Sequence, residues 1–173
     1  SGNVETIFNW FYANEESFLG PDDFKNPRNA DSLRMKNTFA NGSGANQSNI
    51  MYRRRRSVSA PSTVDDLDLL GSLADVFGNT LSFATVRALG IYNRGVIETG
   101  EFVPVAGEDL LVGGAGSANN AWRELFNGDP DAHIQVRSGG QLVLTAPLDG
   151  LDVKSGEDVL RVQINGSGSN TIY

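Results

Sequence analysis

The chain has 173 residues, no cysteine and a single histidine, His133. Without cysteine it has no disulfide framework, thiolate nucleophile or cysteine metal cage, and one histidine cannot form a histidine metal cluster. The missing cysteine fits cytosolic assembly as well as later exposure outside the cell. No run of about 18 apolar residues is present, and the N-terminus lacks the basic start and apolar core of a signal peptide. We expect a soluble protein with no membrane partner.

The motifs of common enzymes are also missing. The glycine run 113–117 lacks the lysine and Ser/Thr that a nucleotide loop uses to hold phosphates and magnesium. Asp131, His133 and Ser138 are close in sequence but match no nucleophile motif. The acidic run 65–68 lacks the glycine and terminal glutamate of a calcium-binding EF-hand loop, so a solvated strand face is expected there. The sequence predicts no catalytic residue, no cofactor and no metal.

Charge is distributed unevenly along the chain. Residues 1–60 carry eight basic and six acidic groups, a net charge of +2, whereas the remainder carries six basic and 15 acidic groups, a net charge of −9. An acidic body repels nucleic acid, because phosphate binding depends on neutralisation by lysine and arginine. We therefore expect no nucleic-acid partner for the body.

Residues 1–49 differ in composition from the rest and are predicted to form an extended N-terminal arm with a polar linker, ahead of a body at 50–173. The spacing allows a short helix from about Glu5 to Tyr12, but no period continues beyond it. Aromatic rings do not stay in water, so the arm packs either on its own body or on a partner chain. Partner docking is favoured because long connections without secondary structure are uncommon inside a domain. The aromatic residues predicted to contact the partner are Phe8, Trp10, Phe11, Tyr12 and Phe18.

Four consecutive arginines, Arg53, Arg54, Arg55 and Arg56, lie in the middle of a predicted strand over 50–58. Alternate side chains of a strand point to opposite faces, so at most two arginines share a face. Three interpretations remain open: an edge strand whose charges meet acidic neighbours, contact with an acidic partner subunit, or contact with nucleic acid. The fixed fork of arginine suits carboxylates, so all four are predicted partner-interface residues.

The body shows period-two alternation of apolar and polar residues, which is typical of half-buried strands. Ile134 and Val136 precede a Ser138–Gly140 turn, and residues 142–146 follow it, which predicts an antiparallel hairpin. Further strands are expected at 63–69, 81–93, 110–112, 160–164 and 171–173. One or two helical turns are expected within 118–128, with Trp122 in the core. About seven or eight short strands predict an all-β, antiparallel β-sandwich or jelly-roll-like body.

Three sets of turn and strand motifs lie between residues 44 and 168. They are 44–47 with 65–73 and 77–83, then 138–144 with 146–147 and Gly150, and finally 156–162 with 165–168. Together they resemble small structural proteins of tailed bacteriophages, over roughly residues 44 to 173. The resemblance implies a virion component with a β-sandwich domain and without catalysis. It leaves open whether the component sits on the head or on the tail.

The leading hypothesis is a capsid decoration (cement) protein on the virion surface, made in the host cytoplasm. Its expected partners are the major capsid protein and further copies of itself, with a trimer preferred over a dimer. One alternative is a tail-, baseplate- or fibre-associated subunit. Another is a carbohydrate-binding module, for which Trp122 and Tyr92 are the exposed-aromatic candidates in the body. Fold alone does not choose among them.

Overall fold

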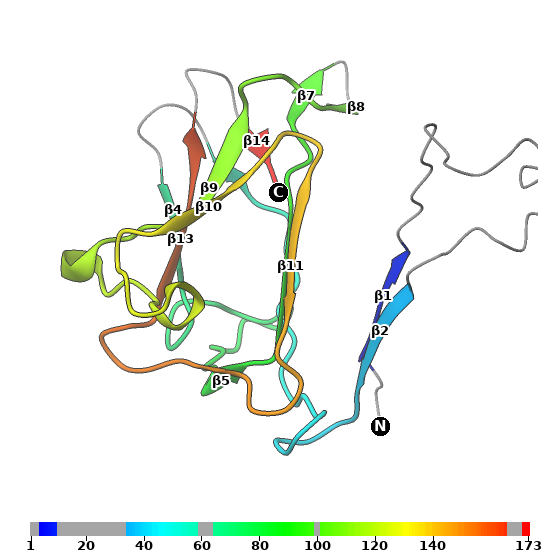
Figure 1. The fold of residues 1–173 in the computed structure, drawn as a ribbon, viewed down its shortest axis with the longest axis vertical. Coiled ribbons are helices and arrows are strands. Elements are labelled where there is room, and N and C mark those ends of the chain that lie inside the picture. Colours follow the sequence, from blue (N-terminus) through cyan, green and yellow to red (C-terminus); the bar gives the residue numbers. More distant parts are fainter. Residues whose placement is uncertain (1–3, 10–33, 59–63, 99–100, 166–170) are drawn as a thin grey trace, which may run out of the picture. The chain divides into compact units, whose positions relative to one another are not determined.

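The computed structural model describes residues 4–9, 34–58, 64–98, 101–165 and 171–173 (Figure 1). It consists mostly of short strands, and every pairing between two named strands is antiparallel. The chain divides into two compact units, Ser1–Ser48 and Asn49–Tyr173. The all-β, antiparallel prediction is therefore confirmed.

The N-terminal unit contains a pair of strands. β1 (Val4–Asn9) pairs with β2 (Arg34–Phe39), and Phe8 of β1 lies opposite Met35. The short helix expected from Glu5 is wrong as far as Asn9, because the β-branched and aromatic residues of this stretch favour an extended backbone. The other four predicted aromatic contacts, Trp10, Phe11, Tyr12 and Phe18, lie outside the described residues.

A four-stranded sheet forms one part of the body, in the order β10–β9–β13–β4. Its strands are β4 (Val64–Asp68), β9 (Asp109–Gly113), β10 (His133–Val136) and β13 (Val159–Asn165). β13 is central and pairs on one side with β4 and on the other with β9. Its apolar residues Leu160, Val162 and Ile164 are buried at alternate positions, as the sequence predicted.

A second set of strands contributes to the same core. β6 (Ala88–Tyr92) pairs with β11 (Gln141–Thr145), and the two-residue strands β5 (Thr85–Val86) and β12 (Leu151–Asp152) pair beside them. The long strand predicted over 81–93 is thus two short ones. One face of β6 is buried through Ile91, whereas Tyr92 on the other face is 51% exposed.

Two further pairs complete the body. β3 (Ser57–Val58) pairs with β14 (Thr171–Ile172), which confirms the strand predicted within 171–173. β7 (Val96–Glu98) pairs with β8 (Glu101–Val103). The strand predicted from Ile50 is wrong before Ser57, since no strand is formed over 50–56. Arg56 nevertheless exchanges two backbone hydrogen bonds with Tyr173, next to the β3–β14 pair.

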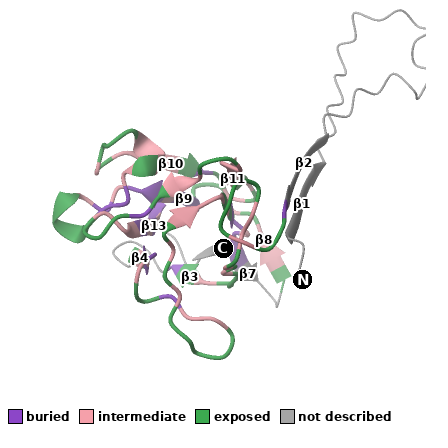
Figure 2. Ribbon diagram, turned by 90° about the horizontal axis from the view of Figure 1, so that it is seen from below, coloured by how far each residue is buried: buried purple, intermediate pink, exposed green. Residues whose placement is uncertain are grey.

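The core of the body unites the four-stranded sheet with the β6–β11 pair (Figure 2). Leu110, Val112 and Val162 have no exposed surface, and Ile91 of β6 belongs to the same buried cluster. Trp122 is 2% exposed, which confirms its predicted core position. It lies between the short 3-10 helices η3 (Ser117–Asn119) and η4 (Glu124–Phe126), and its indole nitrogen donates to the Asp152 carbonyl at 2.7 Å.

The hairpin predicted across Ser138–Gly140 is wrong. β10 pairs with β9, and β11 pairs with β6, so the two strands adjacent in sequence belong to different sheets. The segment 137–140 is therefore a crossing between the two parts of the body. A buried polar network holds the chain in this path, where a hairpin would have used a ladder of backbone hydrogen bonds.

Candidate interaction surface

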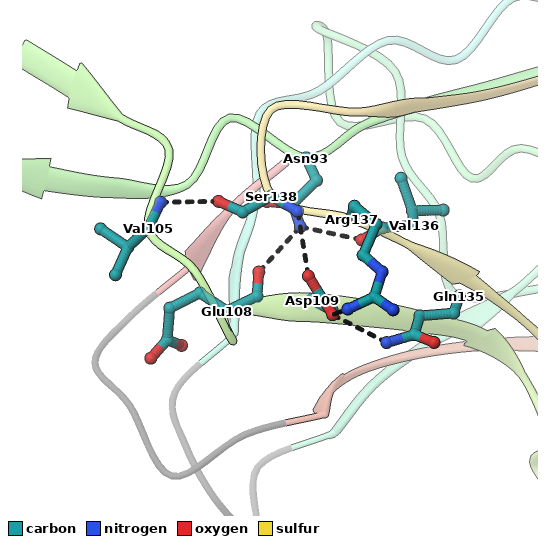
Figure 3. A network of polar contacts seen from close by, with 8 residues as sticks. All are labelled: Asn93, Val105, Glu108, Asp109, Gln135, Val136, Arg137 and Ser138. Carbon is teal, nitrogen blue, oxygen red and sulfur yellow. Dashed lines mark hydrogen bonds and ion pairs between the residues drawn. The ribbon is translucent and has the colours of Figure 1, made fainter.

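Asn93 and Asp109 form the centre of a polar network at this crossing (Figure 3). Asn93 is completely buried, and its side-chain nitrogen donates to the carbonyl oxygens of Glu108, at 2.9 Å, and Val136, at 3.1 Å. Its side-chain oxygen accepts from the Gly95 backbone at 3.0 Å. Every polar atom of this buried amide has a partner, which is the condition for burying it without a large penalty.

The Asp109 carboxylate binds the crossing directly. It accepts hydrogen bonds from the Gln135 side chain and from Arg137, both at 2.7 Å, and from the Ser138 backbone at 3.1 Å. Only 5% of the Asp109 side chain is exposed, whereas Arg137 is 76% exposed. The network is structural, because its groups satisfy one another and fix the loop from β10 to β11.

A second network joins Arg56 to strand β4. The Arg56 guanidinium donates to both oxygens of Asp65 and, at 2.9 Å, to the Tyr52 hydroxyl. The Tyr173 hydroxyl donates to Asp65 at 2.7 Å. Of the four arginines in the run, Arg56 therefore meets an acidic neighbour in its own chain, one of the three interpretations that the sequence left open.

The contacts in this network favour the ionised forms of Asp65 and Arg56 and the protonated form of the Tyr173 hydroxyl. Burial acts to raise the pKa of Asp65, but the hydrogen bonds from Arg56 and Tyr173 outweigh it and lower that pKa below its usual value. The hydrogen bond to Asp65 raises the pKa of Arg56. Burial, together with the Asp65 charge, raises the pKa of the Tyr173 hydroxyl. Asp65 thus belongs to an internal ion pair and not to the solvated face that was predicted for it.

Arg55 of the arginine run and the distant Arg94 both lie near the ring of Phe102. The Arg94 guanidinium carbon lies 3.7 Å from the centroid of the Phe102 ring, and that of Arg55 lies 5.6 Å from it. Both distances are within the range of cation–π attraction. Sequence reasoning singled out Arg55 but missed Arg94 and Phe102, because nothing in the local pattern places residues 55, 94 and 102 together.

These arginines carry positive charge without a carboxylate partner among the described residues. There the ion pairs use Arg56, Arg123, Arg137, Lys154 and Arg161. Arg53, Arg54 and Arg55 are exposed, and Arg94 is half-buried. We call Arg53, Arg54, Arg55, Arg94 and Phe102 the arginine cluster. It is a basic feature on a strongly acidic body.

A second exposed feature is the tip of the loop that joins Ala74 to Thr80. Val76 and Phe77 are 90% and 85% exposed. The loop is held by the Asp75 carboxylate, which accepts from the backbone of Phe77 at 2.8 Å and of Asn79 at 2.9 Å. The Asn79 side chain also donates to the Asp75 carboxylate. This hydrogen bond has the largest effect and, together with the backbone hydrogen bonds, lowers the pKa of Asp75. Two large apolar side chains are thus presented to water on a preorganised turn.

The remaining predicted features are placed as follows. His133 begins β10 at an exposed position. Ser138 lies in the polar network, where its hydroxyl accepts a hydrogen bond from the Val105 backbone. Asp66 pairs with Arg161, and Asp68 accepts from the backbone of Leu70 and Gly71. Within the described ranges, no group of three or more His, Cys, Asp or Glu side chains is arranged to hold a metal ion, and no helix is long and apolar enough to cross a membrane.

The two aromatic candidates for a carbohydrate platform, Trp122 and Tyr92, differ in exposure. Trp122 is buried and donates its indole hydrogen inside the body, so it offers no ring face to a sugar. Tyr92 is exposed.

Comparison of the chain with protein-family models, with curated proteins and with solved structures finds no match.

Proposed function

We propose that the chain is a non-enzymatic structural protein of a bacteriophage virion, most specifically a capsid decoration protein that binds across major capsid subunits. The observation that carries the proposal is the rigid Val76–Phe77 tip. Single exposed apolar residues are ordinary, but two adjacent large ones on a hydrogen-bonded turn are poised to fill an apolar pocket of a partner. The sequence motifs that resemble phage structural proteins supply the kind of partner.

The arginine cluster supports the same proposal. Arginine and aromatic side chains dominate the energetics of protein interfaces, and charge complementarity steers association. Arg53, Arg54 and Arg55 are exposed and can reach a partner, whereas Arg56 is held by Asp65. In contrast, the buried polar groups Asn93 and Asp109 are used to hold the body together.

In this proposal the body is a β-sandwich, and the arm residues Phe8, Trp10, Phe11, Tyr12 and Phe18 bind neighbouring shell proteins. A shell filled with DNA is under outward pressure, and a protein that ties its subunits together through buried apolar area and charge pairs stabilises it. Copies assemble by cyclic symmetry, preferably as trimers. No cofactor, nucleic acid or membrane takes part.

Localisation in the particle tests the proposal. Antibodies against the body, visualised by electron microscopy on intact particles, should label the capsid surface. Label confined to the tail would replace the proposal by the tail-subunit alternative, and unlabelled particles would reject a virion role. A glycan-binding screen addresses the remaining alternative: saturable sugar binding that is lost in Tyr92→Ala would favour a carbohydrate-binding module.

Two variants test the predicted contacts on particles that lack the native protein. Val76→Ser combined with Phe77→Ser should reduce attachment by at least about tenfold, because two apolar anchors are lost. Leu148→Ser is the matched control, since Leu148 is also largely exposed, at 62%, but lies on another loop. Deletion of residues 1–49 should weaken attachment as well, and unchanged attachment would exclude an anchoring role for the arm.

A further inference from the structure

We infer that Arg55, Arg94 and Phe102 form a binding site for the carboxylate groups of an acidic protein segment. The inference deepens the proposed function, and it rests on that function only for the identity of the protein that supplies the segment. The site is centred on the Phe102 ring, which both guanidinium groups approach.

Two positive charges share one aromatic ring in this site. The guanidinium carbons of Arg94 and Arg55 lie 3.7 Å and 5.6 Å from the same ring centroid. The two charges therefore lie within about 10 Å of each other, about one Debye length at 0.1 M salt, and they repel each other. The ring offsets part of the repulsion, and no described carboxylate pairs with either arginine. Bound anionic groups would remove the rest.

Arg94 and Phe102 are held in place by their neighbours. Asn93, directly before Arg94, is fixed by three buried hydrogen bonds. Gly95, directly after it, has a φ of 81°, and a Cβ there would clash with the Val103 carbonyl. The tight approach of Gly95 to Val103 fixes the β7–β8 hairpin, in which Phe102 pairs with Ile97. The backbone at Arg94 and Phe102 is thus held in place before a partner binds.

Arg55 is positioned from the other side of the site. Arg56, the next residue, is bound by Asp65 through its side chain and by Tyr173 through two backbone hydrogen bonds. This anchoring fixes the backbone next to Arg55 while the Arg55 side chain stays exposed. Preorganisation of this kind reduces the entropy lost on binding, so a partner gains more from each contact.

The chemistry of the site favours carboxylates of a protein over a nucleic-acid backbone. The planar fork of arginine binds a carboxylate through two parallel hydrogen bonds. Nucleic acid would also bring many phosphates against a body that carries a net charge of −9 over residues 61–173. A short acidic segment presents two or three carboxylates to the site and few charges elsewhere. It therefore fits the local basic cluster without strong repulsion from the body.

Fluorescence anisotropy with a labelled oligoglutamate peptide tests the inference on the full chain. The chain should bind the peptide in a salt-dependent manner and should bind an oligothymidylate of similar charge more weakly. Arg55→Ala combined with Arg94→Ala should weaken peptide binding at least about tenfold, as expected for loss of two charge-assisted contacts. Phe102→Leu, which keeps bulk but removes the aromatic face, should weaken it about threefold.

Two further variants separate geometry from net charge. Arg94→Lys keeps the charge but loses the flat fork, and it should bind the peptide more weakly than the unmodified chain. Lys154→Ala removes an exposed positive charge that pairs with Glu124 and does not contact the Phe102 ring, and it should leave binding within about twofold. A loss of binding in Lys154→Ala as large as that in the Arg55→Ala/Arg94→Ala variant would overturn the inference, as would tighter binding of oligothymidylate than of oligoglutamate. Because no particle is used, failure here is distinct from failure of the capsid assignment.

Discussion

Arg56 and Asp65 face each other as a fork on a fork, with the Arg56 Nη2 donating to Asp65 Oδ1 at 2.5 Å and its Nε donating to the other oxygen. The pair connects the segment before β3 to strand β4, and Tyr173 closes it from the end of β14. The Asp65 carboxylate thereby joins the nearby segment at Arg56 to Tyr173, which is 108 positions away in the sequence. The pair is partly shielded, with 28% of the Arg56 side chain and 15% of the Asp65 side chain exposed.

Replacing Asp65 by asparagine should destabilise the body by about 2 kcal/mol, because a charge-assisted fork is lost and Arg56 is left half-buried without its counter-charge. The estimate is below the range for fully buried pairs, since solvent still reaches Arg56. Thermal unfolding should show a melting temperature lowered by roughly 4 to 8 °C. Asp66→Asn is the control, since the Asp66 side chain is more exposed than that of Asp65, 37% against 15%, and its loss should cost less than about 1 kcal/mol. Equal effects of the two variants would contradict the argument.

Alkaline pH should weaken the same network through Tyr173. Its pKa is raised in the folded protein, so the stability it contributes is complete below the ordinary tyrosine pKa of about 10 and is lost as pH rises above it. Unfolding by urea, followed between about pH 8 and 11, should show a steeper loss for the unmodified chain than for Tyr173→Phe. At neutral pH that variant should cost about 1 kcal/mol for the lost hydrogen bond. Tyr92→Phe, at an exposed position, should keep the steep alkaline loss.

Asn93→Asp should strongly destabilise the body, although the two side chains have almost the same size and shape. It places a carboxylate against the carbonyl oxygens of Glu108 and Val136, where the native side chain donates two hydrogen bonds. A buried, unpaired charge of this kind costs about 3 kcal/mol or more. Denaturant unfolding should show the loss at neutral pH and partial recovery on acidification, when the carboxyl protonates and can donate again. Asn119→Asp, at an exposed position, should cost no more than about 1 kcal/mol.

Asp158→Asn should stabilise the body. One Asp158 oxygen is buried without a hydrogen-bond partner, and burial, followed by the nearby Asp68 charge, raises the pKa of the carboxyl. A raised carboxyl pKa means that the folded state disfavours the charged form, so the native chain loses stability as pH rises through that value. The variant should therefore gain up to about 1 kcal/mol at pH 7, and the gain should vanish in acid. Asp149→Asn, at an exposed position, should change stability little at either pH.

Local patterns predicted the strands that bury one face and failed where long-range polar contacts decide the path. β13 was predictable because its alternation is uninterrupted, and Trp122 because a large ring in a mixed segment is usually buried. The hairpin across Ser138–Gly140 was wrong, since its two glycines suggested a tight turn while Asp109, from a distant strand, holds that segment in a crossing. A carboxylate at the start of β9 gives no sign in the sequence that it will be buried.

The candidate site was only half predictable for the same reason. A run of four arginines is visible at once, and its acidic neighbours could be anticipated. Which arginine turns inward depends on Asp65 and Tyr173, and which one faces a ring depends on Phe102. None of these partners is near the run in sequence.

The strand order described above also bears on how the chain acquires its structure. Val58 pairs with Thr171, Leu67 with Leu160, and Val86 with Leu151, so these ladders join residues that are far apart in the sequence of the body. The β7–β8 and β9–β10 pairs are more local. Long loops must close before such ladders give any return in contact energy, which slows the search for the native state to milliseconds or longer. Newly synthesised copies would meanwhile expose unpaired edges to one another, so the yield of assembled protein should fall as its rate of synthesis rises.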